Sequence, residues 1–279
     1  MKQILVALAR PHEALRLAQG VTLVAEPGSR VDVVHVLEAH SAETSLQART
    51  LLSEAVEQLQ ARGFSAEGHL VPFSSDGAAP ELARQVRQRR PDLIVMGSRG
   101  LSHLSAVLHG SVSRAILADT DTPALVVPDT AHLPHRPLRR LALAIGHDED
   151  LEPTLHQLPQ LPRPETVLVL HALRRVALHT GPSPYLEIPE TSHQLTVTAL
   201  RRLRRQGLQA ESRELAGGDL PLAIARAAED WGADLILVGS RRLADLQALL
   251  FGSVSHALIR RSHLPVLIAA RLRPQPAPE

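Results

Sequence analysis

The strongest constraint on this chain is an internal repeat. Three segments of the first half recur in the second: DLIVMGSR (92–99) as DLILVGSR (234–241), GSVSRAIL (110–117) as GSVSHALI (252–259), and PALVV (123–127) as PVLIA (265–269). Each pair lies 142 positions apart without a gap, which indicates a tandem duplication. We predict a first domain at 1–128, a linker at 129–138, a second domain at 139–270 and a flexible tail at 271–279.

Each copy alternates short apolar runs with amphipathic segments. The runs are QILVALA, VDVVHVL, SAEGHLVPF, DLIVMG and PALVV in the first copy, and RLALAIG, TVLVLHA, LQAESREL, DLILVG and PVLIA in the second. Runs rich in Val, Ile and Leu that alternate with helices are typical of a parallel sheet covered on both faces. The sequence therefore predicts two small doubly wound α/β domains with five strands each.

Composition excludes several functional classes. Aromatic residues make up only 2% of the chain and the net charge is +1, which disfavours a nucleic-acid binder. Cysteine is absent and Lys2 is the only lysine, so thiolate metal sites and a lysine-based phosphate loop are excluded. Because the sequence has no apolar run of membrane-spanning length and no signal peptide, we expect a cytoplasmic protein without membrane contact.

Glycines and serines are concentrated after the fourth predicted strand. Gly97 and Gly100 follow that strand at the edge where open α/β sheets bind ligands, and glycine lets a ligand approach the main chain there. The next helix opens at Gly110, where free backbone N–H groups favour anions, and Ser111 and Ser113 add hydroxyl donors. Any one of these residues also suits an ordinary strand end or helix cap. Together they indicate a phosphate-binding segment made from backbone.

The pattern Gly97-x2-Gly100-x9-Gly110-Ser111 resembles the nucleotide-binding signature of the universal stress protein family. The resemblance covers nearly the whole chain and favours the tandem form of that family. It implies two Rossmann-like domains of the adenine nucleotide alpha hydrolase-like type. Each would hold a five-stranded parallel sheet of order 3-2-1-4-5 with helices on both faces. It also implies pairing through the last strand and, as in many members, ATP with Mg²⁺ at the edges of strands 1 and 4.

The resemblance assigns site residues by position. In the first domain Val36 would meet the adenine end, and Met96 and Gly97 would lie along the adenosine. The phosphates would be held by a second group of residues: Gly100, Gly110, Ser111, Val112 and Ser113. The counterparts in the second domain are Gly239, Gly252, Ser253 and Ser255.

Both domains depart from the family pattern. ATP-binding members usually end strand 1 with an Asp that meets the adenosine, and here Ala9 and Gly146 stand at that position. Asp148, two residues later, is a candidate replacement in the second domain. Arg242 replaces the second glycine of the signature, where it would either fill the cleft or reach a phosphate. We therefore expect the first domain to bind nucleotide better than the second.

Histidines and candidate nucleophiles offer little further chemistry. His35 and His171 occupy equivalent places in the second predicted strand of each copy, which suggests packing or a hydrogen bond near the cleft. No H-E-x-x-H pattern occurs, and His132-x2-His135 lies in the linker without a nearby carboxylate pair. Ser111 has no base beside it in the sequence, so we expect neither a metal centre nor an efficient enzyme.

Three functional hypotheses remain. The first is a nucleotide-responsive regulatory module of the stress response that binds ATP or a related adenine nucleotide mainly in the first domain. The second is a scaffold without nucleotide, in which the two domains form an internal pseudo-dimer and act on an unknown protein partner. The third is a slow ATP hydrolase. Association of two chains into a homodimer is compatible with each of them.

Overall fold

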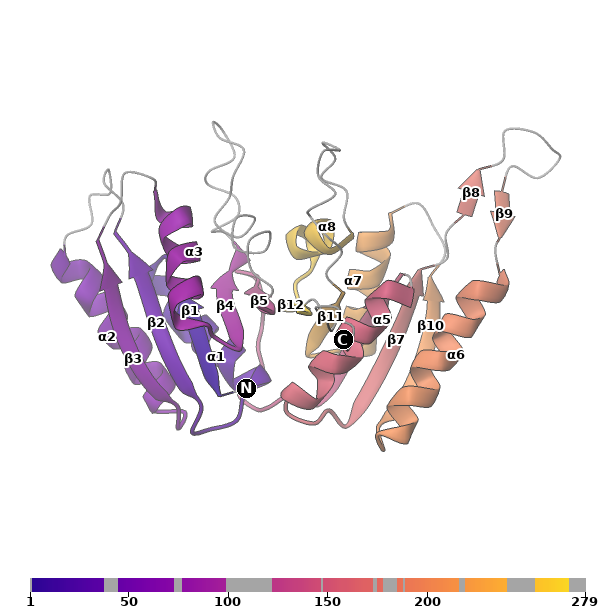
Figure 1. Cartoon of the computed structure of the whole chain (residues 1–279), viewed down its shortest axis with the longest axis horizontal. Coiled ribbons are helices and arrows are strands. Elements are labelled where there is room, and N and C mark those ends of the chain that lie inside the picture. The colour runs from indigo at the N-terminus through magenta and orange to yellow at the C-terminus, as the bar shows by residue number, and fades with distance from the viewer. Residues whose placement is uncertain are drawn as a thin grey trace, which may run out of the picture.

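Both halves of the chain contribute to one continuous sheet. The computed structural model describes residues 2–37, 45–72, 77–98, 122–146, 148–172, 175–177, 185–187, 189–215, 219–239 and 254–270. Within these residues ten strands form a single mostly parallel sheet with helices on both faces (Figure 1). This confirms the predicted α/β class.

The first half follows the predicted alternation of strand and helix. Its elements are β1 (Gln3–Ala7), the 3-10 turn η1 (Pro11–Glu13), α1 (Ala14–Val24), β2 (Arg30–Val36), α2 (Ser45–Gln60), β3 (Ser65–Val71), α3 (Ala78–Arg89), β4 (Leu93–Gly97) and β5 (Ala124–Val127). Gly63 follows α2 with φ of 83°, a left-handed conformation that explains why glycine stands after the helix. The predicted helix at 111–119 lies outside the described residues.

The second half repeats this order with one addition. Its elements are β6 (Arg140–Ile145), α5 (Asp148–Gln157), η3 (Leu158–Gln160), β7 (Thr166–Ala172), β8 (Arg175–Ala177), β9 (Tyr185–Glu187), α6 (Pro189–Arg205), β10 (Gln209–Leu215), α7 (Leu220–Trp231), β11 (Leu235–Val238), α8 (Val254–Arg261) and β12 (Val266–Ile268). The hairpin β8–β9 is the addition, and it lies beyond the carboxyl ends of β7 and β10 (Figure 1). The sequence did not predict it, because three-residue strands are too short to show a period of two.

Strand order within each half agrees with the predicted 3-2-1-4-5. The sheet runs β10-β7-β6-β11-β12-β5-β4-β1-β2-β3, so each half places its first strand between its second and fourth. All neighbouring pairs within a half are parallel, as the apolar runs indicated. The predicted topology is confirmed for both halves.

The two halves meet at an antiparallel seam between β5 and β12. Leu125 is paired with Leu267, and Val126 with Val266. All four side chains are at most 1% exposed. The chain therefore joins its two five-stranded sheets edge to edge by backbone hydrogen bonds and a buried apolar strip, which removes two sheet edges from solvent.

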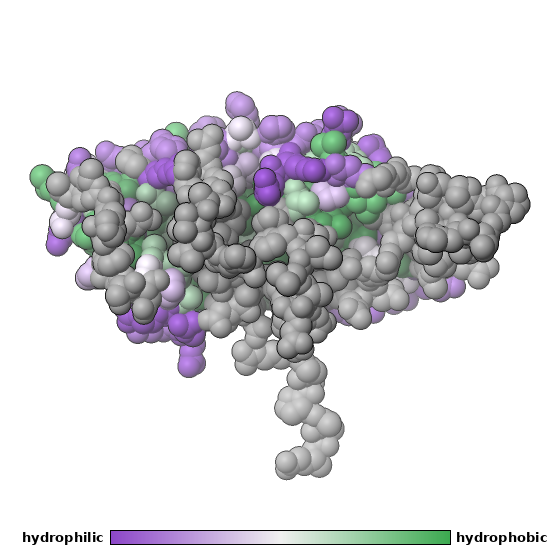
Figure 2. All heavy atoms as spheres, turned by 90° about the horizontal axis from the view of Figure 1, so that it is seen from above, coloured by the Kyte–Doolittle hydropathy of each residue, from purple (hydrophilic) through white to green (hydrophobic). Residues whose placement is uncertain are grey.

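Two apolar cores lie on opposite faces of this sheet, and each extends through both halves. One contains the buried faces of α1, α2, α5 and α6, and the other those of α3, α7 and α8. Seen from above, polar residues form the outer rims and apolar residues lie between them (Figure 2). Among the described residues, no helix combines the length and hydropathy that crossing a bilayer requires.

Candidate functional site

The carboxyl ends of β1 and β4 flank the point where the strand order of the first half reverses. The chain proceeds from β1 to β2 and β3 on one side, and then crosses back to β4 on the other side of β1. Open α/β sheets bind ligands at such a switch point, outside the carboxyl ends of the strands. The same position recurs in the second half between β6 and β11.

Three of the predicted site residues come together at this point. Ala7 on β1 is paired with Val34 on one side and with Met96 on the other. Val36 and Gly97 continue the two flanking strands beyond these pairs, so they lie on either side of the end of β1. Met96 is 4% exposed. The remaining first-domain candidates lie outside the described residues: Gly100, Gly110, Ser111, Val112 and Ser113.

A buried carboxylate that the sequence analysis missed lies at the same edge. Glu13 ends η1, and its side chain is only 1% exposed. A Cβ atom added at Gly97 would lie 3.0 Å from Glu13 Oε1, so this carboxylate stands directly over the main chain of Gly97. Glu13 Oε2 accepts a hydrogen bond of 3.3 Å from the backbone N–H of Ala9. A carboxylate thus contacts the strand end that lacks an Asp.

Helical spacing is the sequence signal that could have predicted the burial of Glu13. Leu17 and Val24 are fully buried on α1, and Glu13 precedes Leu17 by four positions, which places it on the same side of the helix. A glutamate on an apolar stripe needs a polar surrounding. The sequence alone cannot name that surrounding, because Gly97 follows Glu13 by more than eighty positions.

An ion pair connects this edge to the segment after β5. Arg16 on α1 donates from Nη2 to Asp129 Oδ1 at 2.5 Å, and the two side chains are 12% and 11% exposed. The same nitrogen lies 3.9 Å from Glu13 Oε1, which is beyond hydrogen-bond distance. Arg16 therefore donates to Asp129 and lies near Glu13 without a hydrogen bond to it.

The paired histidines make the same contact in both halves. His35 Nδ1 lies 2.8 Å from the backbone oxygen of Leu8, and His171 Nδ1 lies 3.1 Å from that of Ile145. Both side chains are buried, at 3% and 2% exposure. This confirms the prediction of a hydrogen bond near the cleft. Each histidine therefore connects the second strand of its half to the end of the first strand, next to the switch point.

The second half shows how its last helix meets the fourth strand. Ser255, in the first turn of α8, donates from Oγ to the backbone oxygen of Gly239 at 3.4 Å, and Gly239 directly follows β11. Gly252, Ser253 and Arg242 lie outside the described residues. The helix N-terminus therefore lies against the strand end in this half.

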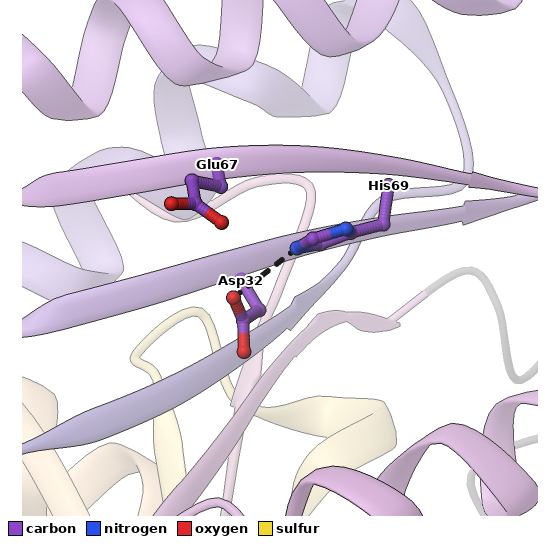
Figure 3. A group of neighbouring side chains, drawn as sticks. All are labelled: Asp32, Glu67 and His69. Atoms are coloured by element: carbon purple, nitrogen blue, oxygen red, sulfur yellow. Dashed lines mark hydrogen bonds and ion pairs between the residues drawn. The ribbon is translucent and has the colours of Figure 1, made fainter.

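A second polar cluster lies on β2 and β3, away from the switch point. Asp32, Glu67 and His69 offer ligand atoms within 4.8 Å of one another, as a metal site would (Figure 3). However, Arg89 Nη1 and Arg30 Nε approach Asp32 at 3.4 and 3.6 Å. Two guanidinium groups already neutralise this buried carboxylate, and they would repel a cation. The donor set does not fit a metal, and we assign the cluster to the stability of the fold.

Asp32 is expected to make the stability of the protein fall at low pH. Burial raises the pKa of its carboxyl, but hydrogen bonds from His69 and Gln3 and the charges of Arg89 and Arg30 outweigh burial and hold the pKa below 3.8. Because the pKa of Asp32 is lower in the folded state than in the unfolded state, its ionised form stabilises the protein at any pH above the unfolded-state pKa. This stabilisation is lost as the pH falls through the folded-state pKa. Asp32→Asn should cost ~1–3 kcal/mol at pH 7, and the difference from wild type should shrink below about pH 4.

Urea denaturation of both proteins across this pH range measures the effect. Glu67→Gln is the matched control, because Glu67 belongs to the same cluster but is 63% exposed. Its loss should stay within about 0.5 kcal/mol at every pH. A difference between Asp32→Asn and wild type that is the same at pH 3 as at pH 7 would contradict this assignment.

Comparisons with known proteins agree with the repeat. The model of the universal stress protein family matches residues 1–128 and again residues 138–270. Universal stress protein YxiE of Bacillus subtilis (strain 168) is 34% identical over 82 residues, which are 29% of this chain and 55% of that protein. Universal stress protein MJ0577 of Methanocaldococcus jannaschii is 42% identical over 48 residues, which are 17% of this chain and 30% of that protein. The chain thus spans about half or less of these relatives.

One solved structure has the same fold over nearly the whole chain. The crystal structure of a universal stress protein from Archaeoglobus fulgidus DSM 4304 matches with a TM-score of 0.65 at 19% identity. The match covers 96% of this chain and 96% of that one. It supports the arrangement of two Rossmann-like halves.

Proposed function

The chain belongs to the universal stress protein family through both of its halves, and we propose that its first half binds ATP or a related adenine nucleotide. The binding position is the switch point at the carboxyl ends of β1 and β4. Binding of the nucleotide would bias the conformation of the segment from Gly97 to Ser113 and of the surface around it. The protein would then act as a nucleotide-responsive regulatory module. The cytoplasmic location and the protein partner stay predictions from the sequence.

The observation that carries this proposal is the convergence of Val36, Met96 and Gly97 at the end of β1. The register of β1 with both neighbours brings these residues to one edge, although they come from distant parts of the sequence. Val36 is partly exposed at this edge, and Met96 and Gly97 are buried beside it, so a purine would lie against Val36. Among the described residues, polar groups at this edge include the Glu13 carboxylate and the main chain of Ala9 and Gly97.

The internal repeat supports the phosphate end of the site. In the second half Ser255 holds the first turn of α8 against Gly239 at the end of β11. Ser113 and Gly97 stand 142 positions before these two residues, in the same register of the repeat. This register is consistent with the proposal that Gly110, Ser111 and Ser113 supply the phosphate-binding groups of the first half.

Release of bound nucleotide and calorimetry test the proposal. The purified chain is denatured, the supernatant is examined for adenine nucleotides, and Mg-ATP is then titrated into nucleotide-free protein. We expect binding that Gly110→Leu weakens at least tenfold, because a large side chain would block approach to the backbone N–H groups. Gly252→Leu is the matched control at the equivalent position, and it should change the affinity less than threefold.

Two outcomes would replace the proposal. If no nucleotide is released and millimolar Mg-ATP gives no heat and no thermal shift, the scaffold hypothesis takes its place. The continuous seam between β5 and β12 favours that alternative, because it already joins the two halves as a fixed pair. If the wild-type chain releases phosphate steadily and Gly110→Leu does not, the protein is an ATP hydrolase.

A further inference from the structure

Glu13 is a buried carboxylate with an unused acceptor oxygen. Among the described residues, Glu13 Oε1 has no hydrogen-bond partner, and its side chain is 1% exposed. The other oxygen, Oε2, accepts only a long bond of 3.3 Å from Ala9. Arg16 lies 3.9 Å away and donates to Asp129 instead. A buried polar atom without a partner is costly, and native structures retain few of them.

The position of this oxygen points to a ligand. It stands over the main chain of Gly97 at the carboxyl end of β4, and the same carboxylate contacts the main chain of Ala9 after β1. These two strand ends flank the switch point of the sheet, where open α/β folds place their ligands. An acceptor without a protein donor at a ligand-binding edge is available for a donor on the ligand.

The charge of this group restricts the ligand atoms that it can meet. An ionised Glu13 carboxylate can only accept hydrogen bonds, and the nearby Arg16 guanidinium donates to Asp129. A phosphate would be repelled here, whereas hydroxyl or amine donors would gain a charge-assisted hydrogen bond. The nucleoside end of a nucleotide offers such donors, in its ribose hydroxyls and in its exocyclic amine.

The internal repeat carries an acidic residue at the same sequence spacing. Ile4 and Leu141 hold equivalent positions, because each pairs with the first residue of the fourth strand of its half. Glu13 and Asp150 each follow these residues by nine positions. The two halves differ at the end of strand 1, with Ala9 and Gly146, yet the sequence of each has an acidic residue nine positions after the equivalent strand residue.

We propose that Glu13, at the end of η1, supplies the carboxylate that the end of β1 lacks, and that Glu13 Oε1 accepts a hydrogen bond from a neutral donor of the bound nucleoside. This inference rests on the proposed function and adds the orientation of the ligand to it. The nucleoside end of the ligand lies toward Glu13. Selectivity for the nucleoside thus comes from the first helix and not from the first strand.

Glu13→Gln tests the inference, since it keeps the size of the side chain and removes its charge. Glu26→Gln, the same change at an exposed glutamate beyond α1, is the matched control. Calorimetry is carried out with ATP, 2′-deoxy-ATP, 3′-deoxy-ATP and inosine triphosphate, which lacks the exocyclic amine. Thermal unfolding verifies that each variant is folded at the temperature of the titration.

We expect Glu13→Gln to weaken ATP binding about tenfold and Glu26→Gln to leave it unchanged. One of the three analogues should bind wild type about tenfold more weakly than ATP, and that difference should shrink in Glu13→Gln, whose neutral amide oxygen accepts a weaker hydrogen bond. The analogue identifies the donor as a ribose hydroxyl or the amine.

Other results overturn the inference and can be told apart. If wild type binds ATP and Glu13→Gln binds it equally well, the proposed function stands and the role of Glu13 is wrong. Tighter binding by Glu13→Gln would show that the carboxylate obstructs the site. If wild type binds none of the four nucleotides, the proposed function fails and the inference fails with it.

Discussion

Replacing Leu125 with aspartate is expected to unfold both halves of the protein. Leu125 is fully buried on β5, between β4 and the seam strand β12. Removing a buried leucine costs about 2–5 kcal/mol, and a carboxylate without a partner in the same place adds several more. This sum reaches the whole stability of an ordinary domain, about 5–15 kcal/mol.

The single tryptophan makes the effect on the other half measurable. Trp231 lies on α7 in the second half, with the Arg140 guanidinium 4.3 Å from its ring centre. Both apolar cores continue across the seam, and loss of β5 would expose the edge of β12. Trp231 fluorescence should therefore report unfolding although the substitution lies in the first half. Circular dichroism follows the loss of helix in parallel.

Two variants control for this prediction. Leu46→Asp makes the same chemical change at a leucine that is 74% exposed, and it should cost less than about 0.5 kcal/mol. Leu125→Met keeps the volume and should cost less than about 1.5 kcal/mol. Native Trp231 emission in Leu125→Asp would contradict the prediction, since it would show that the second half folds without the seam.

Removing the carboxylate of Asp234 should cost the second half about 3 kcal/mol or more. Asp234 accepts two hydrogen bonds of 2.9 Å from the Arg136 guanidinium, and its Oδ2 also accepts from the backbone N–H groups of Arg139 and Arg140 at 2.9 Å. Asp234→Ala leaves a guanidinium and two backbone donors without this acceptor. The carboxylate thus ties the segment before β6 to the start of β11.

Asp92 offers the matched comparison in the first half. Its Oδ2 accepts from the backbone N–H groups of Lys2 and Gln3 at 2.8 and 3.0 Å, and the residue is exposed. Water can replace the lost acceptor there, so Asp92→Ala should cost about 1 kcal/mol. Guanidinium denaturation followed by Trp231 fluorescence and circular dichroism measures both variants. Equal losses in the two halves would show that the Arg136 contact adds no stability.

The strands were predictable because local sequence carries their signal. A strand buried on both faces reads as a continuous apolar run, and the runs at β4 and β11 are nearly identical in the two halves. The strand order and the pairing through the last strand came from the family resemblance. The short hairpin β8–β9 was missed because its strands of three residues leave no periodic signal.

The site was predictable only in part. Gly97, Met96 and Val36 were assigned by the family resemblance, and the structure places them at the ends of β2 and β4. Glu13 was missed, because its role depends on its contacts with the main chain of Gly97 and Ala9, which its neighbours in the sequence do not reveal. The same is true of Asp32, whose cluster with Glu67 and His69 draws in arginines from β2 and α3.

The sequence by itself determined that this protein has two copies of one α/β unit, because a tandem repeat and the apolar runs of buried strands can be recognised within short segments of sequence. The family resemblance implied pairing through the last strand, whereas only the tertiary structure decided that β5 and β12 of the same chain pair and that Glu13, at the end of η1, reaches the strand end where Ala9 stands. The physical reason is the range of the interactions. Apolar periodicity acts within a segment, whereas edge pairing and the burial of a carboxylate depend on groups that folding brings together.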